Sequence, residues 1–254
     1  MSEILGFVSL TGDVEKSNLL VNLAASLSRS DKRVLVVDLG LPFPTLDVLF
    51  GVAESAVYTA TDVALGRVSL SDAVLRVPLK AGRRETEDRL FLLPASPLES
   101  ETEKVSTLLS LLRAEKEYDL VLVLFSHPTC VRKGLDGLFL LTDADEISLR
   151  AAEAQNAKLG ADAFLLTGYP TDWDSLLPLA SPISAIDRLG ISLFGIVPRL
   201  PKDLLGILEG CTRARGYLCA VRNVANRILG NDVPLLAGVS LAGVSRRQLL
   251  ASKG

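Results

Sequence analysis

The sequence predicts an α/β protein with a doubly wound, mostly parallel sheet and helices on both faces. Short, continuous apolar runs recur along the chain, as expected for strands buried on both sides of a parallel sheet. Segments with helical spacing of apolar residues separate these runs and are long enough for right-handed crossovers. A chain of 254 residues, 48% hydrophobic and 22% charged, is sufficient for one such domain.

The predicted strands follow one another from the N-terminus. They are Ile4–Leu10, Arg33–Leu39, Leu90–Leu93, Leu120–Phe125, Leu138–Leu141, Ala163–Thr167 and Ser192–Val197. Predicted helices separate or follow them at Asn18–Ser28, Glu101–Glu115, Ser148–Leu159, Ile183–Leu189 and Tyr217–Leu229. Arg76–Asp88 is the most polar stretch before Leu90 and is predicted to be an exposed loop. Because no linker or repeat divides the chain, residues 1–240 are predicted to form a single domain, followed by a tail at 241–254.

Composition narrows the classes of function. The 27 basic and 30 acidic residues give a net charge of −3, whereas nucleic-acid-binding domains usually carry a basic stripe, so no nucleic-acid partner is expected. Cys130, Cys211 and Cys219 are too few and too irregularly spaced for a metal site, and no bound metal is expected. The N-terminus does not resemble a signal peptide, and no apolar run reaches the roughly 18 residues of a membrane helix. The protein is predicted to be cytoplasmic.

A candidate phosphate loop follows the first strand. In a doubly wound sheet this strand–loop–helix junction is the natural place for a phosphate, because backbone amides and the helix N-terminus present partial positive charge. Here the junction spans residues 9–18, and Lys16-Ser17 stands where a P-loop places its lysine and its Mg²⁺-binding hydroxyl. Gly12, Lys16 and Ser17 are therefore the candidate nucleotide-binding residues.

This junction resembles the deviant Walker A box of the MinD/ParA family, Gly-Lys-Gly-Gly-Val-Gly-Lys-Thr/Ser. Aligned without gaps, Gly12, Val14, Lys16 and Ser17 match that pattern. Further similarities keep the family's order along most of the chain: Lys32–Asp38, Leu46–Gly51, Leu92–Ser96, Tyr118–Val123 and Leu189–Pro198. The resemblance implies a P-loop ATPase fold of the MinD/ParA type.

The same alignment reveals departures within the loop. Leu10, Asp13 and Glu15 replace glycines, and Thr11 replaces the early lysine that active members extend across their dimer. Carboxylates at positions 13 and 15 would repel a polyphosphate by an amount on the order of kcal/mol each at an effective dielectric of about 20. Their side chains also occupy space that glycine leaves to the phosphates. Lys16 could instead be neutralised within the loop by one of these carboxylates.

Two further departures affect catalysis. Gly40 stands at the position where active members carry a water-positioning aspartate, and Leu124 stands at that of the Walker B aspartate. Phosphoryl transfer depends almost wholly on positioned charge and metal. The sequence therefore predicts no catalytic residues and no ATP hydrolysis, and it does not predict ATP as a cofactor.

These features together predict a catalytically degenerate MinD/ParA-like scaffold or spatial organiser of the cell pole, pilus assembly or the division site. Its atypical boxes are similar to those of the TadZ/CpaE branch. The alternative is a divergent ATP-binding switch, or an ATPase with weak or no hydrolysis. Expected partners are a second copy of the chain or an active MinD/ParA-like ATPase. The 241–254 tail is weakly amphipathic, so membrane contact is a further alternative.

Overall fold

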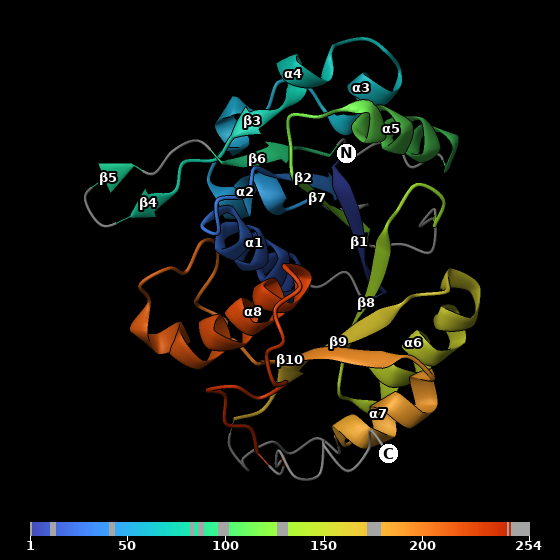
Figure 1. Ribbon diagram of the computed structural model, residues 1–254, viewed down its shortest axis with the longest axis vertical. Helices are drawn as coiled ribbons and strands as arrows, with labels where there is room; N and C mark the ends of the chain where they lie inside the picture. Colours follow the sequence, from blue (N-terminus) through green and yellow to red (C-terminus); the bar gives the residue numbers. More distant parts are fainter. Residues whose placement is uncertain are drawn as a thin grey trace.

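The computed structural model describes residues 2–10, 14–40, 44–81, 84–85, 89–95, 102–125, 132–171, 179–242 and 244. These residues form an eight-stranded sheet in the order β10-β9-β8-β1-β7-β2-β6-β3 (Figure 1). All neighbouring strands are parallel except β3, which pairs antiparallel with β6 at one edge. The predicted α/β class with a mostly parallel sheet is confirmed.

The strands of the sheet correspond closely to the apolar runs of the sequence. They are β1 (Glu3–Ser9), β2 (Val34–Leu39), β3 (Leu75–Arg76), β6 (Leu90–Leu93), β7 (Leu120–Phe125), β8 (Gly137–Asp143), β9 (Ala163–Tyr169) and β10 (Ser192–Pro198). A separate hairpin pairs β4 (Lys80–Ala81) with β5 (Arg84–Glu85). Every residue of β6, β7 and β9 is buried, which explains why these strands lack the alternation of a half-exposed strand.

Helices cover both faces of the sheet. The elements are α1 (Val14–Ser28), α2 (Leu46–Phe50), α3 (Ala60–Ala64), α4 (Leu70–Ala73), α5 (Thr102–Ala114), α6 (Glu146–Leu159), α7 (Pro182–Leu189) and α8 (Arg215–Ile228), with short 3₁₀ helices η1 (Ala53–Ser55) and η2 (Thr212–Ala214). In Figure 1, α1 and α8 lie side by side on one face, whereas α5, α6 and α7 lie on the other. This arrangement follows from right-handed crossovers that run in opposite directions along the sheet on the two sides of β1.

Capping residues set the two ends of α6. Asp145 caps α6 by accepting hydrogen bonds from the amides of Ile147 and Ser148, and Gly160 ends that helix with a φ of 60°. The Asp145 cap places the start of α6 at Glu146, two residues before the predicted start.

The predicted exposed loop at Arg76–Asp88 is wrong in its described part. Arg76 belongs to β3, and Val77 and Leu79 are buried in the core. These two apolar residues alternate with exposed neighbours, so they place one side of an edge segment against the core while the other side faces solvent. A simple count of polar residues missed this period of two.

Gly195 allows α8 to approach β10 closely. A Cβ atom at this position would lie 2.7 Å from Val224 Cγ2 and 3.0 Å from Leu165 Cδ2. Val224 belongs to α8 and is stiff at its branched Cβ, so it cannot move aside without cost. Glycine therefore sets the spacing between this strand and this helix.

We predict that Gly195→Ala lowers the free energy of unfolding by about 1–3 kcal/mol, because the added methyl overpacks the β10–α8 contact. Gly216→Ala is the matched control, since a Cβ at Gly216 in α8 would meet nothing within 4 Å. The control should be neutral or stabilising by up to about 1 kcal/mol. Urea unfolding of both variants measures the difference, and equal midpoints would contradict the packing constraint.

Candidate functional site

The candidate site lies at the carboxyl ends of the central strands. β1 pairs with β7 on one side and with β8 on the other, so the sheet has its topological switch point at the end of β1. Ligands of open α/β sheets bind at this point. A cleft of about 590 Å³ lies here, and its lining residues include Glu15, Asp143, Gly168, Arg199 and Lys202.

Lys16 is paired inside the protein. It stands in the first turn of α1, its side chain is only 1% exposed, and its Nζ donates a hydrogen bond to Asp143 Oδ2 at 2.7 Å. Thr167 Oγ1 donates to the other carboxylate oxygen, Asp143 Oδ1. The ion pair thus connects α1 with the ends of β8 and β9 across the cleft. Asp143 belongs to the candidate site, and the sequence did not single it out.

Glu15 faces the same cleft. Its Oε1 accepts a hydrogen bond from the Leu200 amide at 3.2 Å, just after β10. Gly168 lies between the two carboxylates with a φ of 63°, and a Cβ there would lie 3.2 Å from Asp143 Oδ1 and 3.9 Å from Glu15 Oε1. Glycine is therefore required both by its backbone conformation and by the close approach of the acidic groups.

The charges around the cleft have mixed signs. Glu15, Asp143 and Asp145 contribute carboxylates, whereas Arg199 and Lys202 contribute cations from the segment after β10. Burial raises the pKa of Asp145, but hydrogen bonds from Ser148 and Ile147 prevail and hold that pKa below its usual value. Asp145 is therefore an ionised cap of α6, and a polyanion entering the cleft would meet negative charge at this edge.

Leu124 and Gly40 occupy the positions that the sequence marked. Leu124 is buried in β7, where its backbone lies in register between Phe7 of β1 and Asp38 of β2. Gly40 donates its amide hydrogen to Asp38 Oδ1 at 2.8 Å. Because leucine and glycine carry no carboxylate, neither position supplies an acidic group to the cleft.

Asp38 organises the connection from β2 to α2. Its carboxylate accepts hydrogen bonds from the amides of Gly40, Thr45 and Leu46. Burial raises the pKa of Asp38, while these three amides act in the opposite direction by stabilising the ionised form. These three hydrogen bonds join the buried carboxylate to the protein's own backbone, which gives it a structural role.

Two buried asparagines on α1 hold the segment after β10 against the helix. Asn18 Oδ1 accepts from the Gly206 amide at 2.7 Å. Asn22 accepts from the Leu208 amide at 2.9 Å and donates to the Gly206 carbonyl at 3.0 Å. Their spacing of four residues within the otherwise apolar stretch from Asn18 to Ala25 is a signal that the sequence analysis missed.

Of the remaining loop positions, the structure describes only some. Leu10 and Ser17 are half-buried at the two ends of the junction. Thr11, Gly12 and Asp13 lie outside the described residues, so their predicted roles stay predictions. The predicted boundary at residue 240 also stays a prediction; Ala242 next to it donates its amide hydrogen to Pro170.

Comparison with known proteins finds distant relatives of this chain. The septum site-determining protein MinD of Synechocystis is 25% identical over 98% of this chain and 99% of its own length. MinD of Bacillus subtilis is 26% identical, with 92% of each chain covered. The chain is a distant homologue of these MinD proteins. No family model matches it.

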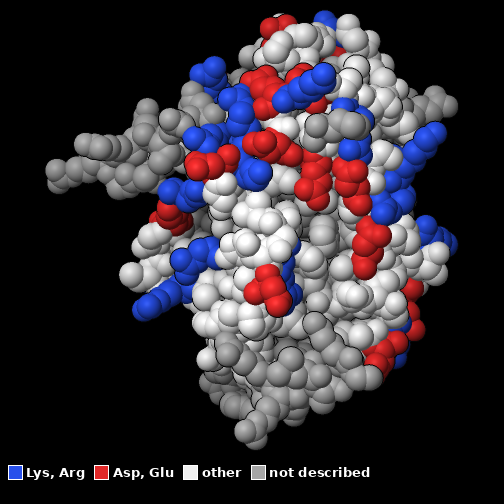
Figure 2. Space-filling view, in the orientation of Figure 1, with Lys and Arg blue, Asp and Glu red and all other residues white. Residues whose placement is uncertain are grey.

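A solved MinD structure has the same fold. MinD in the MinC:MinD cell division complex of Aquifex aeolicus superposes with a TM-score of 0.73 at 21% identity, covering 92% of this chain and 98% of the other. At this identity the likeness concerns the fold. Within the described residues of this MinD/ParA homologue, no helix is long and apolar enough to span a membrane. On the face shown in Figure 2, basic and acidic side chains are interspersed without a broad basic area.

We predict that Lys16 and Asp143 are energetically coupled. Lys16→Met should lower the free energy of unfolding by about 1–3 kcal/mol, because it leaves a partly buried carboxylate without its cation. In the double variant with Asp143→Asn, most of that loss should be recovered, which corresponds to a coupling energy of about 1–2 kcal/mol in urea unfolding. Additive effects of the two substitutions would contradict the coupling.

Proposed function

We propose that this MinD/ParA homologue is a protein-binding spatial organiser whose nucleotide site is closed by the Lys16–Asp143 ion pair, and that it does not turn over ATP. The observation that supports this proposal is the pair itself. A P-loop lysine must be available to the phosphates, but here Lys16 is 1% exposed and bonded to Asp143 at 2.7 Å.

The electrostatics of the cleft also favour a site that holds no nucleotide. A phosphate would have to separate Lys16 from Asp143 and leave that carboxylate beside an anion. Two like charges 4 Å apart cost about 4 kcal/mol at an effective dielectric of about 20. Glu15, held by the Leu200 amide, adds a second carboxylate on the same side. The site thus satisfies its own cation and opposes the charge of a polyphosphate.

The absence of turnover is supported by the two catalytic positions. Leu124 is buried within β7, and an aliphatic side chain cannot hold Mg²⁺. Gly40 has no side chain with which to position an attacking water. Because phosphoryl transfer relies on exactly such metal-bound and charged groups, their replacement removes the means of hydrolysis.

Exposed apolar side chains at the rim of the cleft support a role in protein binding. Val14 and Leu205 line the cleft and are 43% and 53% exposed. Apolar side chains grouped around a concave surface are typical of interaction sites. We propose that this rim contacts a second copy of the chain or an active MinD/ParA-like ATPase. Since the relatives are septum site-determining proteins, the proposed process is positioning of the division site or of machinery at the cell pole.

The second candidate is an ATP-binding switch with weak or no hydrolysis. Distant homology to a family of ATPases favours it, and so does the cleft of about 590 Å³ beside α1, which lies within the size range of ligand sites. In this case a nucleotide would displace Asp143 from Lys16, and the ion pair would be the resting state of the switch.

Titration with Mg-ATP separates the two candidates. We predict no binding heat for the wild-type protein at high micromolar concentration, which corresponds to a Kd weaker than about 1 mM. The reason is that Lys16 is neutralised and the cleft carries Glu15 and Asp143. Isothermal titration calorimetry of the wild type, Lys16→Ala and Asp143→Asn makes the comparison.

The control for Asp143→Asn is Asp187→Asn, which removes the same charge from an exposed position on α7. Binding by the wild type that is lost in Lys16→Ala would replace the proposal with the ATP switch. Binding that appears in Asp143→Asn but not in Asp187→Asn would identify the ion pair as the element that closes the site.

We also predict that the cleft rim mediates self-association. Val14→Asp combined with Leu205→Asp should weaken a homodimer at least tenfold (about 1.4 kcal/mol), because each aspartate would be desolvated at an apolar contact. Sedimentation velocity over a concentration series measures the dimer constant. Val57→Asp is the control, since Val57 is 76% exposed and lies outside the cleft. If the double variant and the control associate equally, the rim is not the interface.

A further inference from the structure

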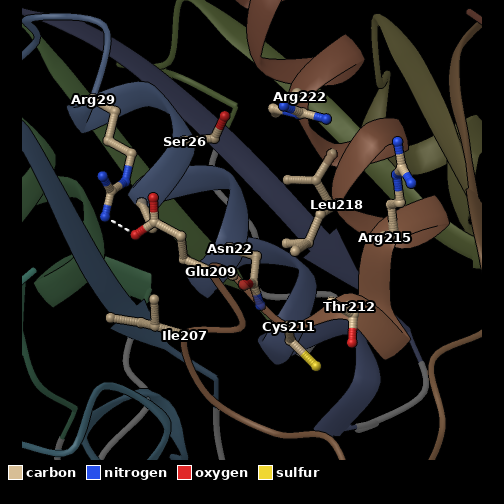
Figure 3. A pocket seen from close by; sticks show the side chains of 13 residues that line it. Asn22, Ser26, Arg29, Ile207, Glu209, Cys211, Thr212, Arg215, Leu218 and Arg222 are labelled. Carbon is tan, nitrogen blue, oxygen red and sulfur yellow. Dashed lines mark ion pairs between the residues drawn. The ribbon is translucent and has the colours of Figure 1, made fainter. Parts of the chain in front are cut away.

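A second cavity lies between α1 and α8, away from the cleft at the strand ends. It has a volume of about 530 Å³ and is bordered by those helices and by residues 207–212 (Figure 3). Among the residues that the structure describes, it shares none of its lining with the cleft that contains Asp143. Its size is typical of a site for a small molecule.

Regular helical spacing builds the walls of this pocket. Asn22, Ala25 and Ser26 lie on one stripe of α1, with Arg29 just after its end, and Arg215, Leu218 and Arg222 lie on one stripe of α8. Asn22 fixes the segment after β10 by its bonds to Gly206 and Leu208. The pocket is therefore held open by buried hydrogen bonds and needs no rearrangement to form.

Charge is distributed unevenly around the opening. At one end Arg29 forms an ion pair with Glu209, so both charges are compensated. At the other end Arg215 and Arg222 are exposed, and neither has an ion-pair partner among the residues that the structure describes. Figure 3 shows the two ends on opposite sides of the pocket. An anion is thus attracted by the α8 arginines, whereas the compensated Arg29–Glu209 pair offers it no net positive charge.

The walls between these ends are aliphatic. Ala25, Ile207, Leu218 and Val221 supply the apolar surface, and none of the described residues that line the pocket is aromatic. Nucleobases are commonly held by stacking on aromatic rings, so this lining favours an aliphatic body over a nucleotide. Ser26 and Thr212 add hydroxyl groups to the donors of the arginines.

We propose that this pocket binds a small aliphatic amphiphile with one carboxylate or phosphate group. The anionic group is held by the guanidinium groups of Arg215 and Arg222, which match carboxylate and phosphate in bidentate geometry. The aliphatic body lies over Leu218 and Ile207 and points toward the Arg29–Glu209 pair. The orientation follows from the placement of the two arginines without an acidic partner at one end and of a neutral ion pair at the other. This site is independent of whether the cleft at the strand ends binds a nucleotide.

Three probes with the same alkyl chain test the proposal: decanoate, decyl phosphate and decyltrimethylammonium, each titrated calorimetrically as a monomer. The anions should bind and the cation should not. Arg215→Gln combined with Arg222→Gln should weaken the anions about tenfold or more, because charge-assisted hydrogen bonds are lost. The matched control is Arg150→Gln with Arg213→Gln, which removes the same charge from two exposed ion pairs outside the pocket. A preference between the two anions distinguishes a carboxylic from a phosphorylated ligand.

Cys211 provides a readout of where the probes bind. Its half-buried thiol lines the pocket, whereas Cys219 lies outside it and contacts the Ala237 carbonyl. Decanoate should slow the alkylation of Cys211 by iodoacetamide severalfold and leave Cys219 unchanged; mass spectrometry of tryptic peptides separates the two cysteines. The proposal is overturned if neither anion binds, if the cation binds equally well, if the arginine variant binds like its control, or if Cys211 is not protected.

Discussion

The ion pair between Lys16 and Asp143 connects the parts of the molecule on which the candidate site depends. Lys16 starts the helix after β1, and Asp143 ends β8, the neighbour of β1 in the sheet. A buried lysine is costly unless a carboxylate compensates it, so the two elements are constrained to meet at this distance. Thr167 at the end of β9 and the positive φ of Gly168 then complete the surroundings of the carboxylate. One interaction thus fixes the relative positions of α1, β8 and β9.

Side chains of α1 also hold the segment after β10 in place. Asn18 and Asn22 of α1 bind backbone groups of Gly206 and Leu208, and Glu15 binds the Leu200 amide. A buried backbone group that lacks a partner costs about 1–3 kcal/mol, so these side chains stabilise a connection that has no regular structure of its own. Glu15 also lines the cleft at the strand ends, and Asn22 lines the pocket beside α8, so the same helix contributes to both cavities.

The proposed roles of these cavities depend on whether the cations at each one are already paired with carboxylates. In the cleft the lysine is already compensated, and the carboxylates of Glu15 and Asp143 oppose an anion. In the α1–α8 pocket the two arginines of α8 have no acidic partner among the described residues, so they are available to an anionic ligand. We therefore propose that the cleft at the strand ends no longer accepts a polyphosphate, whereas the α1–α8 pocket accepts a different anion.

Much of the fold was predictable from the sequence, because a strand buried on both faces of a parallel sheet must be apolar throughout. The runs at Leu90–Leu93 and Leu120–Phe125 coincide with β6 and β7 residue for residue. Short motifs of neighbouring residues can also be recognised in the sequence, and the resemblance to MinD/ParA proteins was based on such motifs. The helix starts and the β3 edge were less accurate, because capping bonds and partial burial depend on neighbours distant in the chain.

The order of the amino acids establishes which residues stand at the phosphate loop and at the two catalytic positions, since identity and order need no coordinates. What Lys16 binds depends on how the chain packs in three dimensions. Its partner lies 127 residues away, and nothing in the local pattern around Asp143 marks it. The same holds for Asn22 and the segment at 206–208, and for the arginines that share the α1–α8 pocket. Packing of remote segments creates these contacts, and a one-dimensional pattern contains no record of the distances that result.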